Sequence, residues 1–193
     1  MLSPSEKASC LTLAREAIRS EWFPASQKAL QSLQVQGIPP FKAACFVTLT
    51  QNGTLRGCIG TLWPYRSLAE DVHGNAHAAA FEDPRFSSLS PSEEPQTAIE
   101  ISLLSTPQLW SGTSQELLAQ QVQKPQGVIF RCEGRQATFL PQVWEQLSGE
   151  RFFSELSRKA GCSPQAWHQS TAQFWTYQVE AFSDPAETFL NRP

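Results

Sequence analysis

The amino-acid sequence predicts an α+β fold, a largely antiparallel sheet flanked by helices. Two predicted hairpins, which turn at Asn52-Gly53 and Glu133-Gly134, indicate antiparallel strands. The predicted helices are mixed with these hairpins without the regular strand–helix alternation of a parallel sheet. A chain of 193 residues, 40% hydrophobic and 17% charged, is typical of one globular domain, with room for a lesser lobe. We therefore expect a single domain over residues 1–193.

Composition excludes several classes of function. The net charge is -3, and no block of Lys and Arg stands out, which argues against a nucleic-acid binder. The N-terminus has no apolar signal core, and the longest apolar runs are far shorter than the roughly 20 residues that span a bilayer. We expect a soluble cytoplasmic protein. The five cysteines form no C-x-x-C pair, which favours reduced thiols over disulfides or a zinc site.

The first helix has a clear start signal. Ser3 is the expected N-cap, Pro4 the first helical residue, and Glu6 completes a capping box. Apolar residues at helical spacing then continue to about Ser20. A second short helix is expected after "WFPAS".

The next segment, "FKAACFVTLTQNGTLRGCIGTL", predicts a hairpin around Asn52-Gly53. Counting back from a two-residue loop, we expect Cys58 opposite Val47, with Arg56 on the same face as Cys58. Both faces of this hairpin are substantially apolar. It should therefore lie in the interior of a covered sheet, where Arg56 is either buried with a partner or directed into a cleft.

A helix is predicted over "SLAEDVHGNAHAAAFED", and its inward positions include Leu68 and Val72. Asp83 precedes Pro84 and is therefore pushed out of helical geometry, so "DPRF" is expected to be a turn at the helix exit. A short helix should follow Ser90, where a cap-and-proline start recurs.

The remainder of the chain alternates strands and helices. We expect a strand over "TAIEISLLS", a capped helix over "TSQELLAQQVQ" and the second hairpin over "GVIFRCEGRQATFL". A helix over "FFSELSRKAG" should end at Gly161. A short helix at "SPQAW" and one alternating strand over "FWTYQVEAF" complete the prediction.

The string "LRGCIG", residues 55–60, resembles the signature of the AMMECR family. The resemblance continues, in the expected order, through further segments that cover nearly the whole chain: "NAHAAAFEDPRF", "IEISLLSTP", "TFLPQVW" and "KAG" with Trp167 beyond it. Bacterial members of this family are called AmmeMemoRadiSam system protein A.

The resemblance implies an architecture and possible partners. Family members fold as an α+β unit with a larger lobe that holds both termini and a smaller lobe. The signature lies near the junction, where a cleft is the proposed site. Bacterial members are encoded beside a Memo-type protein and a radical SAM protein, which suggests a shared pathway or complex with both.

Cys58 is the candidate catalytic residue. The nearby cation Arg56 would lower the pKa of its thiol from about 8.5 and favour a nucleophilic thiolate. Most free cysteines, however, are packed small hydrophobes, and no spacing rule ties a histidine base to Cys58.

Arg56, Asp83 and Arg85 are the candidate ligand-binding residues. A guanidinium among apolar strand neighbours requires a carboxylate or an anionic ligand. Asp83 is the expected ion-pair partner of Arg56. Alternatively, Arg56 and Arg85 together bind the carboxylate or phosphate of a small anionic ligand.

No metal site or cofactor is predicted. His73 and His77 are four residues apart on one helical face, but the pattern lacks the Glu of H-E-x-x-H and a third ligand. Two functional hypotheses follow. In one, an interlobe cleft lined by "LRGCIG" binds or transforms a small anionic metabolite. In the other, the protein is a non-catalytic adaptor in which the signature is an architectural core strand.

Overall fold

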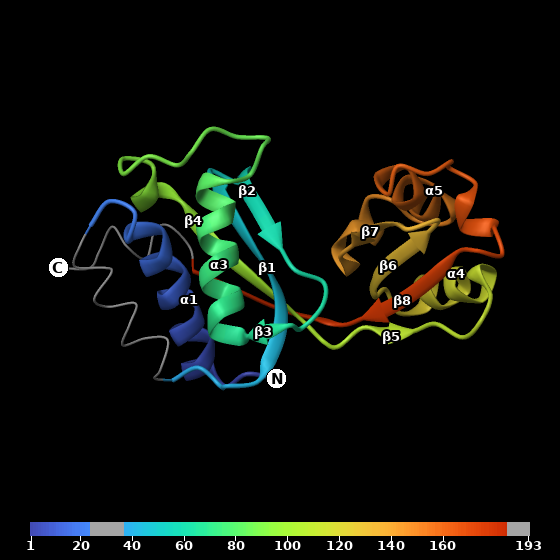
Figure 1. Ribbon diagram of the computed structural model, residues 1–193, viewed down its shortest axis with the longest axis horizontal. Helices are drawn as coiled ribbons and strands as arrows, with labels where there is room; N and C mark the ends of the chain where they lie inside the picture. The colour runs from blue at the N-terminus through green and yellow to red at the C-terminus, as the bar shows by residue number, and fades with distance from the viewer. Residues whose placement is uncertain (24–36, 185–193) are drawn as a thin grey trace. The chain divides into compact units, whose positions relative to one another are not determined.

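The computed structural model describes residues 1–23 and 37–184 (Figure 1). The short helix expected after "WFPAS" lies outside the described residues. The α-helices are α1 (Pro4–Arg19), α3 (Leu68–Phe81), α4 (Ser114–Gln123) and α5 (Glu150–Lys159), and the short 3-10 helices are η1 (Glu94–Gln96), η2 (Pro141–Glu145) and η3 (Ala166–His168). The strands are β1 (Lys42–Gln51), β2 (Thr54–Gly60), β3 (Arg66–Ser67), β4 (Ala98–Leu104), β5 (Gln108–Leu109), β6 (Gly127–Cys132), β7 (Arg135–Phe139), β8 (Gln173–Tyr177) and β9 (Val179–Asp184).

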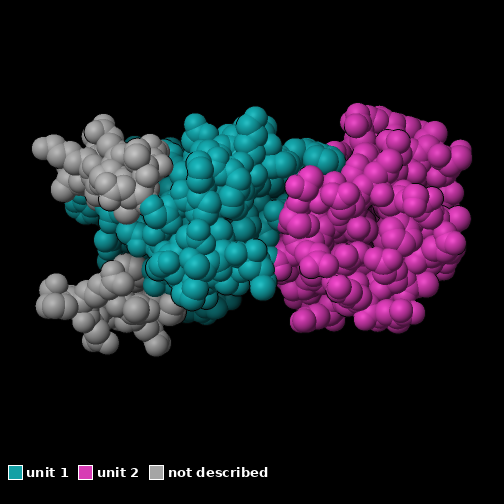
Figure 2. Space-filling model, turned by 90° about the horizontal axis from the view of Figure 1, so that it is seen from below, with its two compact units in different colours: residues 1–104, 180–193 teal, residues 105–179 magenta. Residues whose placement is uncertain are grey.

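The chain divides into two compact units, coloured separately in Figure 2. Unit 1 comprises Met1–Leu104 and the segment that begins at Glu180, and unit 2 comprises Ser105–Val179. The sheet of unit 1 has the order β2-β1-β4-β9, with β3 beside β1, and the sheet of unit 2 has the order β5-β8-β6-β7. The pairs β1–β2, β1–β4, β6–β7 and β6–β8 are antiparallel. The α+β prediction is therefore confirmed, while the cleft between two lobes stays a prediction.

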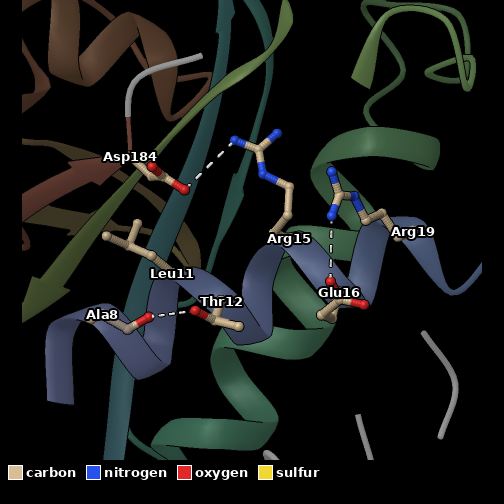
Figure 3. A pocket seen from close by; sticks show the side chains of 7 residues that line it. All are labelled: Ala8, Leu11, Thr12, Arg15, Glu16, Arg19 and Asp184. Atoms are coloured by element: carbon tan, nitrogen blue, oxygen red, sulfur yellow. Dashed lines mark hydrogen bonds and ion pairs between the residues drawn. The ribbon is translucent and has the colours of Figure 1, made fainter. Parts of the chain in front are cut away.

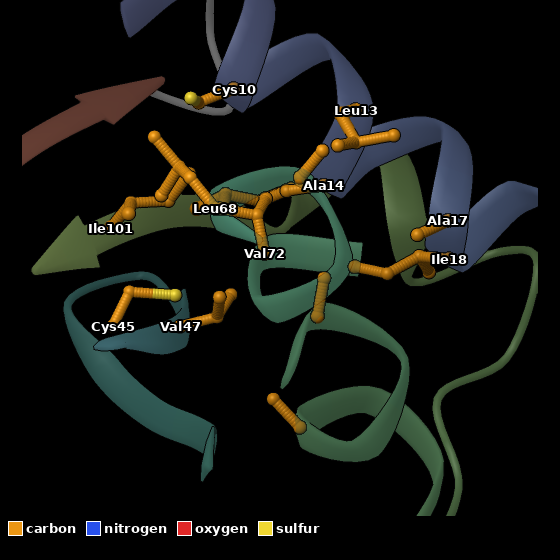
Figure 4. Close-up of a cluster of buried hydrophobic side chains, with 14 of the residues drawn as sticks. Cys10, Leu13, Ala14, Ala17, Ile18, Cys45, Val47, Leu68, Val72 and Ile101 are labelled. Atoms are coloured by element: carbon orange, nitrogen blue, oxygen red, sulfur yellow. The ribbon is translucent and has the colours of Figure 1, made fainter. Parts of the chain in front are cut away.

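Unit 1 has its core between one face of its sheet and two helices (Figure 1). Figure 4 shows side chains of α1 meeting those of α3, β1 and β4 in this core. The apolar periodicity of the sequence places them there, because positions three or four apart in a helix and two apart in a strand share a face. The labelled members are Cys10, Leu13, Ala14, Ala17, Ile18, Cys45, Val47, Leu68, Val72 and Ile101.

Helix α1 begins as predicted. The Ser3 side chain accepts a hydrogen bond from the Glu6 amide, and the Glu6 carboxylate accepts one from the Ser3 amide at 2.7 Å. Thr113 and Glu116 form the same capping box at α4. Because a capping box satisfies amides that the first helical turn leaves unpaired, these local signals are sufficient to define where each helix begins.

A buried carboxylate attaches α3 to the sheet. Asp71 is fully buried and accepts hydrogen bonds from the Cys45 amide, the Thr61 hydroxyl, the Arg66 guanidinium and the Asn75 side-chain amide. A buried charge is tolerated only when it is paired and hydrogen-bonded, and Asp71 meets both conditions. The network joins β1, the loop after β2, and α3 into one body. The sequence prediction did not single out Asp71.

The predicted register of the first hairpin is wrong beyond its turn. Gln51 pairs with Thr54 as a two-residue loop requires, but a β-bulge then shifts the register. Cys58 lies opposite Thr48 instead of Val47, and Arg56 is the extra residue of the bulge. Since side chains alternate along a strand, a one-residue shift moves Cys58 to the opposite face of the sheet.

The sheet order corrects a second expectation. Strand β2 lies at the edge of the sheet of unit 1, not in its interior. The core face of β1 carries buried Cys45, Val47 and Leu49, whereas Thr48 and Cys58 are half-buried on the other face.

The predicted closing strand is two strands. The segment "FWTYQVEAF" is interrupted at Gln178, so that β8 pairs with β5 and β6 in unit 2, and β9 joins the sheet of unit 1. At this position the Gln178 amide donates to the Ser105 hydroxyl at 2.9 Å, and the Ser105 amide donates to the Gln178 carbonyl. An alternating pattern indicates a strand but not the sheet to which it belongs.

Unit 2 has a separate aromatic core. Phe152 of α5 packs against Trp144, and Phe153 stacks on Trp167. The second hairpin turns at Glu133-Gly134, and both residues have positive φ, as its predicted turn requires. Among the described residues, no helix is long and apolar enough to cross a membrane.

Candidate functional site around the LRGCIG strand

The free edge of β2 is held by two side chains of the turn that follows α3. The Cys58 amide donates to Asp83 Oδ2 at 2.9 Å, and Arg85 Nη2 donates to the Cys58 carbonyl oxygen at 3.3 Å. The two side chains are themselves paired, with Arg85 Nη2 2.6 Å from Asp83 Oδ2. They thus occupy the backbone groups that a neighbouring strand would use. We call this arrangement the Asp83–Arg85 clasp.

The clasp is electrostatically stable. Asp83 is buried, yet the hydrogen bond from Arg85 holds the pKa of its carboxyl well below the ordinary value, helped by the amides of Cys58 and Arg85. In turn, Asp83 raises the pKa of Arg85. The Arg85 side chain is 54% exposed, so one side of the clasp is open to solvent.

Arg56 pairs with Glu93, not with Asp83. Its Nε lies 2.9 Å from Glu93 Oε1, and its Nη1 donates to the Ser87 carbonyl oxygen at 2.9 Å. The predicted Arg56–Asp83 pair is therefore wrong. Because Arg56 is the extra residue of the bulge, its side chain points to the loop before η1 and not to the turn at Asp83.

Glu93 is the site residue that the sequence prediction missed. Its Oε1 accepts from Arg56, while its Oε2 accepts from the Ser90 amide and hydroxyl at 2.9 and 2.8 Å. The Arg56 and Ser90 hydrogen bonds lower the pKa of Glu93 to about 2. A sequence signal existed, since a Glu three residues after Ser90 has the capping-box spacing. Nothing in that spacing indicated the pairing with Arg56.

The Cys58 thiol has a hydroxyl as its neighbour. In the described part of the chain, its side-chain hydrogen bond is to Thr48 Oγ1 at 3.4 Å, and no imidazole or carboxylate is bonded to it. The thiol is half-buried. General-base activation of a thiol requires a base within hydrogen-bond reach, so the geometry contains a thiol without an adjacent base.

Close packing against α3 explains why residue 57 of the signature strand is a glycine. A Cβ on Gly57 would lie 2.1 Å from the Ala79 carbonyl oxygen of α3. Helix α3 therefore approaches the backbone of β2 more closely than any side chain allows. This contact fixes which face of β2 meets the helix, and Cys58 takes the other face.

The histidines do not form a metal site in the described residues. His77 contacts Glu21 and Glu82 at 3.4 and 3.3 Å, and burial lowers the pKa of His73. No group of three potential metal-binding side chains occurs among residues 1–23 and 37–184.

A small pocket of about 150 Å³ lies on α1, away from the signature (Figure 3). Its lining includes Arg15, Arg19 and Asp184, with Arg15 Nη2 3.9 Å from Asp184 Oδ2. Arg15 is 2% exposed and donates to the buried Glu94 carboxylate at 3.1 Å. These contacts connect α1 to η1 and to the end of β9, which identifies a structural ion-pair network.

The sequence was compared with protein families and with known proteins, and the matches extend over most of the chain. The family model AMMECR1 matches residues 11–182. A protein of Methanosarcina mazei is 30% identical over 188 residues, which cover 95% of this chain and 94% of that protein. A protein of Methanosarcina barkeri is 32% identical over 171 residues, covering 86% and 85%.

A solved structure has the same fold. The crystal structure of the uncharacterized protein PH0010 from Pyrococcus horikoshii aligns with a TM-score of 0.73 and 27% identity, covering 92% of both chains. Matches over nearly the full length, in sequence and in fold, agree with the resemblance carried by "LRGCIG" and the segments after it. The chain belongs to the AMMECR1 family.

Proposed function

We propose that this protein is a non-catalytic binding partner in which the LRGCIG strand is architectural. The observation that carries the proposal is that the side chains at the signature are bonded to other groups of the same chain. Arg56 is bonded to Glu93 and Ser87, and Asp83 and Arg85 are bonded to each other and to the Cys58 backbone. Side chains committed to such contacts stabilise a strand edge and a loop, and they would have to give up those contacts to act on a substrate.

The environment of Cys58 supports the same proposal. Its thiol is bonded to Thr48, and among residues 1–23 and 37–184 no base that could activate a nucleophile is hydrogen-bonded to it. The partners that we propose are a Memo-type protein and a radical SAM protein, which are encoded beside bacterial members of the family that the sequence resembles.

Co-purification tests the proposal. The tagged full chain is expressed with the Memo-type and radical SAM proteins encoded by the same organism, and its complexes are isolated. We expect at least one of the two to co-purify, and Cys58→Ser to recover the same amount. Loss of function by a folded Cys58→Ser protein in a complementation assay, with partners still bound, would show that the thiol has a chemical role and would overturn the non-catalytic assignment.

A second candidate function is supported by one observation, the 54% exposure of the Arg85 side chain beside half-buried Cys58. In this alternative, a site at the signature strand binds or transforms a small anionic metabolite, with Arg85 as the anion-binding residue and Arg56, Asp83 and Cys58 around it. An exposed guanidinium can donate two parallel hydrogen bonds to a carboxylate or phosphate.

Thermal unfolding with inorganic phosphate and with succinate separates the two candidates. The anion hypothesis predicts a saturable rise in Tm that Arg85→Gln abolishes and that Arg158→Gln, on the surface of unit 2, retains. An unchanged Tm with both anions supports the binding-partner proposal.

A further inference from the structure

Unit 2 contains a pocket that is independent of the signature strand. It has a volume of about 390 Å³ and lies between the segment that leads from β5 into α4 and the segment around η3 and β8. Volumes of roughly 300–1,000 Å³ are typical of small-molecule sites. The aromatic residues that line it are Trp110, Trp167, His168 and Phe174.

Three of the rings in and under this pocket form a stack. Phe153 and Trp167 are stacked, with centroids 5.1 Å apart and planes at 25°. The His168 imidazole lies against Trp167, with centroids 3.7 Å apart and planes at 33°. Phe153 is fully buried, Trp167 is 2% exposed, and His168 is exposed and lines the pocket. The stack therefore begins in the core of unit 2 and ends at the pocket.

The opposite wall is fixed by hydrogen bonds. Trp110 donates from its backbone amide to the Phe174 carbonyl oxygen and from indole Nε1 to the Thr113 carbonyl oxygen, both at 2.9 Å. Gly112 lies close to this indole, because a Cβ there would be 3.0 Å from Trp110 Nε1. The wall is therefore preorganised, which reduces the conformational entropy lost when a ligand binds.

Apart from the His168 imidazole, the polar side chains that line the pocket carry no ionisable group. Among the described residues that line it, none is Lys, Arg, Asp or Glu, and the rim carries amides and hydroxyls that include Gln169, Gln173 and Ser114. Amides both donate and accept hydrogen bonds, as do the edges of nucleobases. A phosphate or carboxylate would find no Lys or Arg among these lining residues to compensate its charge.

We propose that this pocket binds an uncharged heteroaromatic ring of nucleobase size, stacked on His168. The aromatic stack supplies a π-face, and base–aromatic stacking is a general mode of recognition. The rim amides supply contacts to the edge of the ring. The site is separate from the binding-partner function proposed above and does not depend on it.

The test uses the full chain with four probes: adenosine, guanosine, cytidine and uridine. Saturation-transfer NMR detects binding to the base protons, and a titration gives Kd. We expect at least one nucleoside to bind saturably with a Kd on the order of 1 mM or tighter, which is the affinity range of small ligands of this size. Absence of saturable binding by all four overturns the proposal, as does equal binding of D-glucose, which has no aromatic ring.

Variants at the end of the stack identify the site. His168→Ala should weaken binding at least about tenfold, because it removes the stacking face. His168→Phe should largely restore it, since a flat ring is retained. His77→Ala, in unit 1, is the matched control and should bind like the wild type. Unchanged affinity in folded His168→Ala overturns the assignment of this pocket.

A second variant protects the test against misfolding at His168. Gly112→Ala places a methyl group against both the Glu116 carboxylate, at 2.7 Å, and the Trp110 indole, at 3.0 Å, and we expect it to weaken binding while Ser111→Ala does not. A single-stranded oligonucleotide distinguishes a free ligand from a base in a chain. It should bind no more tightly than its nucleoside, because no Lys or Arg is among the described residues that line the pocket. Much tighter, salt-sensitive binding of the oligonucleotide would overturn the small-ligand assignment.

Discussion

The backbone amide of Cys58 is held by the carboxylate of Asp83, 25 residues further along the chain, at 2.9 Å. This contact connects the two most recognisable segments of the sequence, "LRGCIG" and "DPRF". It is made to the backbone of Cys58 and leaves the thiol free to contact Thr48. The contact that joins the two segments therefore depends on the position of Cys58 in the strand and not on its sulfur.

Removal of the Asp83 carboxylate should destabilise unit 1. In Asp83→Ala the Cys58 amide and the Arg85 guanidinium both lose their partner, and an unsatisfied buried donor costs about 1–3 kcal/mol. Urea unfolding measures the loss. Asp83→Asn is the matched control and should lose less, because its side-chain oxygen can still accept from the Cys58 amide. Equal stability of Asp83→Ala and the wild type would contradict the clasp.

The same variant should expose the edge of β2. Unpaired backbone groups at a sheet edge promote pairing with other chains. We therefore expect Asp83→Ala to form dimers or larger species in a concentration-dependent manner in size-exclusion chromatography with light scattering. Glu93→Gln, which perturbs the neighbouring loop and leaves the clasp in place, should stay in the wild-type oligomeric state.

Stability should fall in acid because of Glu93 and Asp83. The pKa of Glu93 is lowered to about 2 by Arg56, and the pKa of Asp83 is lowered by Arg85. A carboxyl with a lowered pKa in the folded state stabilises the fold above its unfolded pKa and loses this contribution as the pH falls through its folded pKa. Between about pH 5 and pH 2 the unfolded state binds more protons, so stability should decrease across this window.

Comparison with Glu93→Gln tests this assignment. Urea midpoints measured from pH 6 downward should decline less steeply in the variant than in the wild type. Parallel curves for the two proteins would mean that the Arg56–Glu93 pair contributes nothing to the pH dependence.

The five thiols should differ in reactivity. Cys10, Cys45 and Cys132 are buried, whereas Cys58 and Cys162 are half-buried. Burial raises the pKa of Cys10 to about 12 and also raises that of Cys45, and the thiolate is the reactive form. We expect iodoacetamide to label Cys58 and Cys162 first in the native protein, with the other three labelled only after unfolding. Peptide mass spectrometry gives the order, and early labelling of Cys10 or Cys45 would be inconsistent with the core of unit 1.

Gly57→Ala should be among the most damaging small substitutions. The new methyl group would lie 2.1 Å from the backbone oxygen of Ala79, so the strand or the helix must move. Overpacking of this kind typically costs about 1–3 kcal/mol. Thr54→Ala, at an exposed position of the same strand, should change the free energy of unfolding by less than about 0.5 kcal/mol. Wild-type stability of Gly57→Ala would contradict the close approach of α3.

Local chemistry made several parts of the fold predictable from the sequence. The capping box of Ser3 and Glu6 and the turn at Asn52-Gly53 depend on residues three or fewer positions apart, and both are confirmed. Amphipathic spacing also identified α3 and its buried positions, including Leu68 and Val72. These features are predictable because neighbouring residues determine them.

The candidate site depended on contacts between distant segments. The sequence indicated that Arg56 needs a carboxylate or an anionic ligand, since a charge among apolar neighbours must be compensated, but it predicted Asp83 as the partner and did not indicate Glu93. The choice of Glu93, 37 residues away, depends on the bulge that directs Arg56 to the loop before η1.

The sequence by itself determined the family, the fold class, the starts of α1, α3 and α4, and the need for a counter-charge at Arg56. Only the tertiary structure decided the face on which Cys58 lies. A strand pattern of period two is compatible with either register, and one bulge residue reverses every side chain beyond it. Close packing of Gly57 on the Ala79 carbonyl selects the register, and neither residue indicates that contact in the sequence.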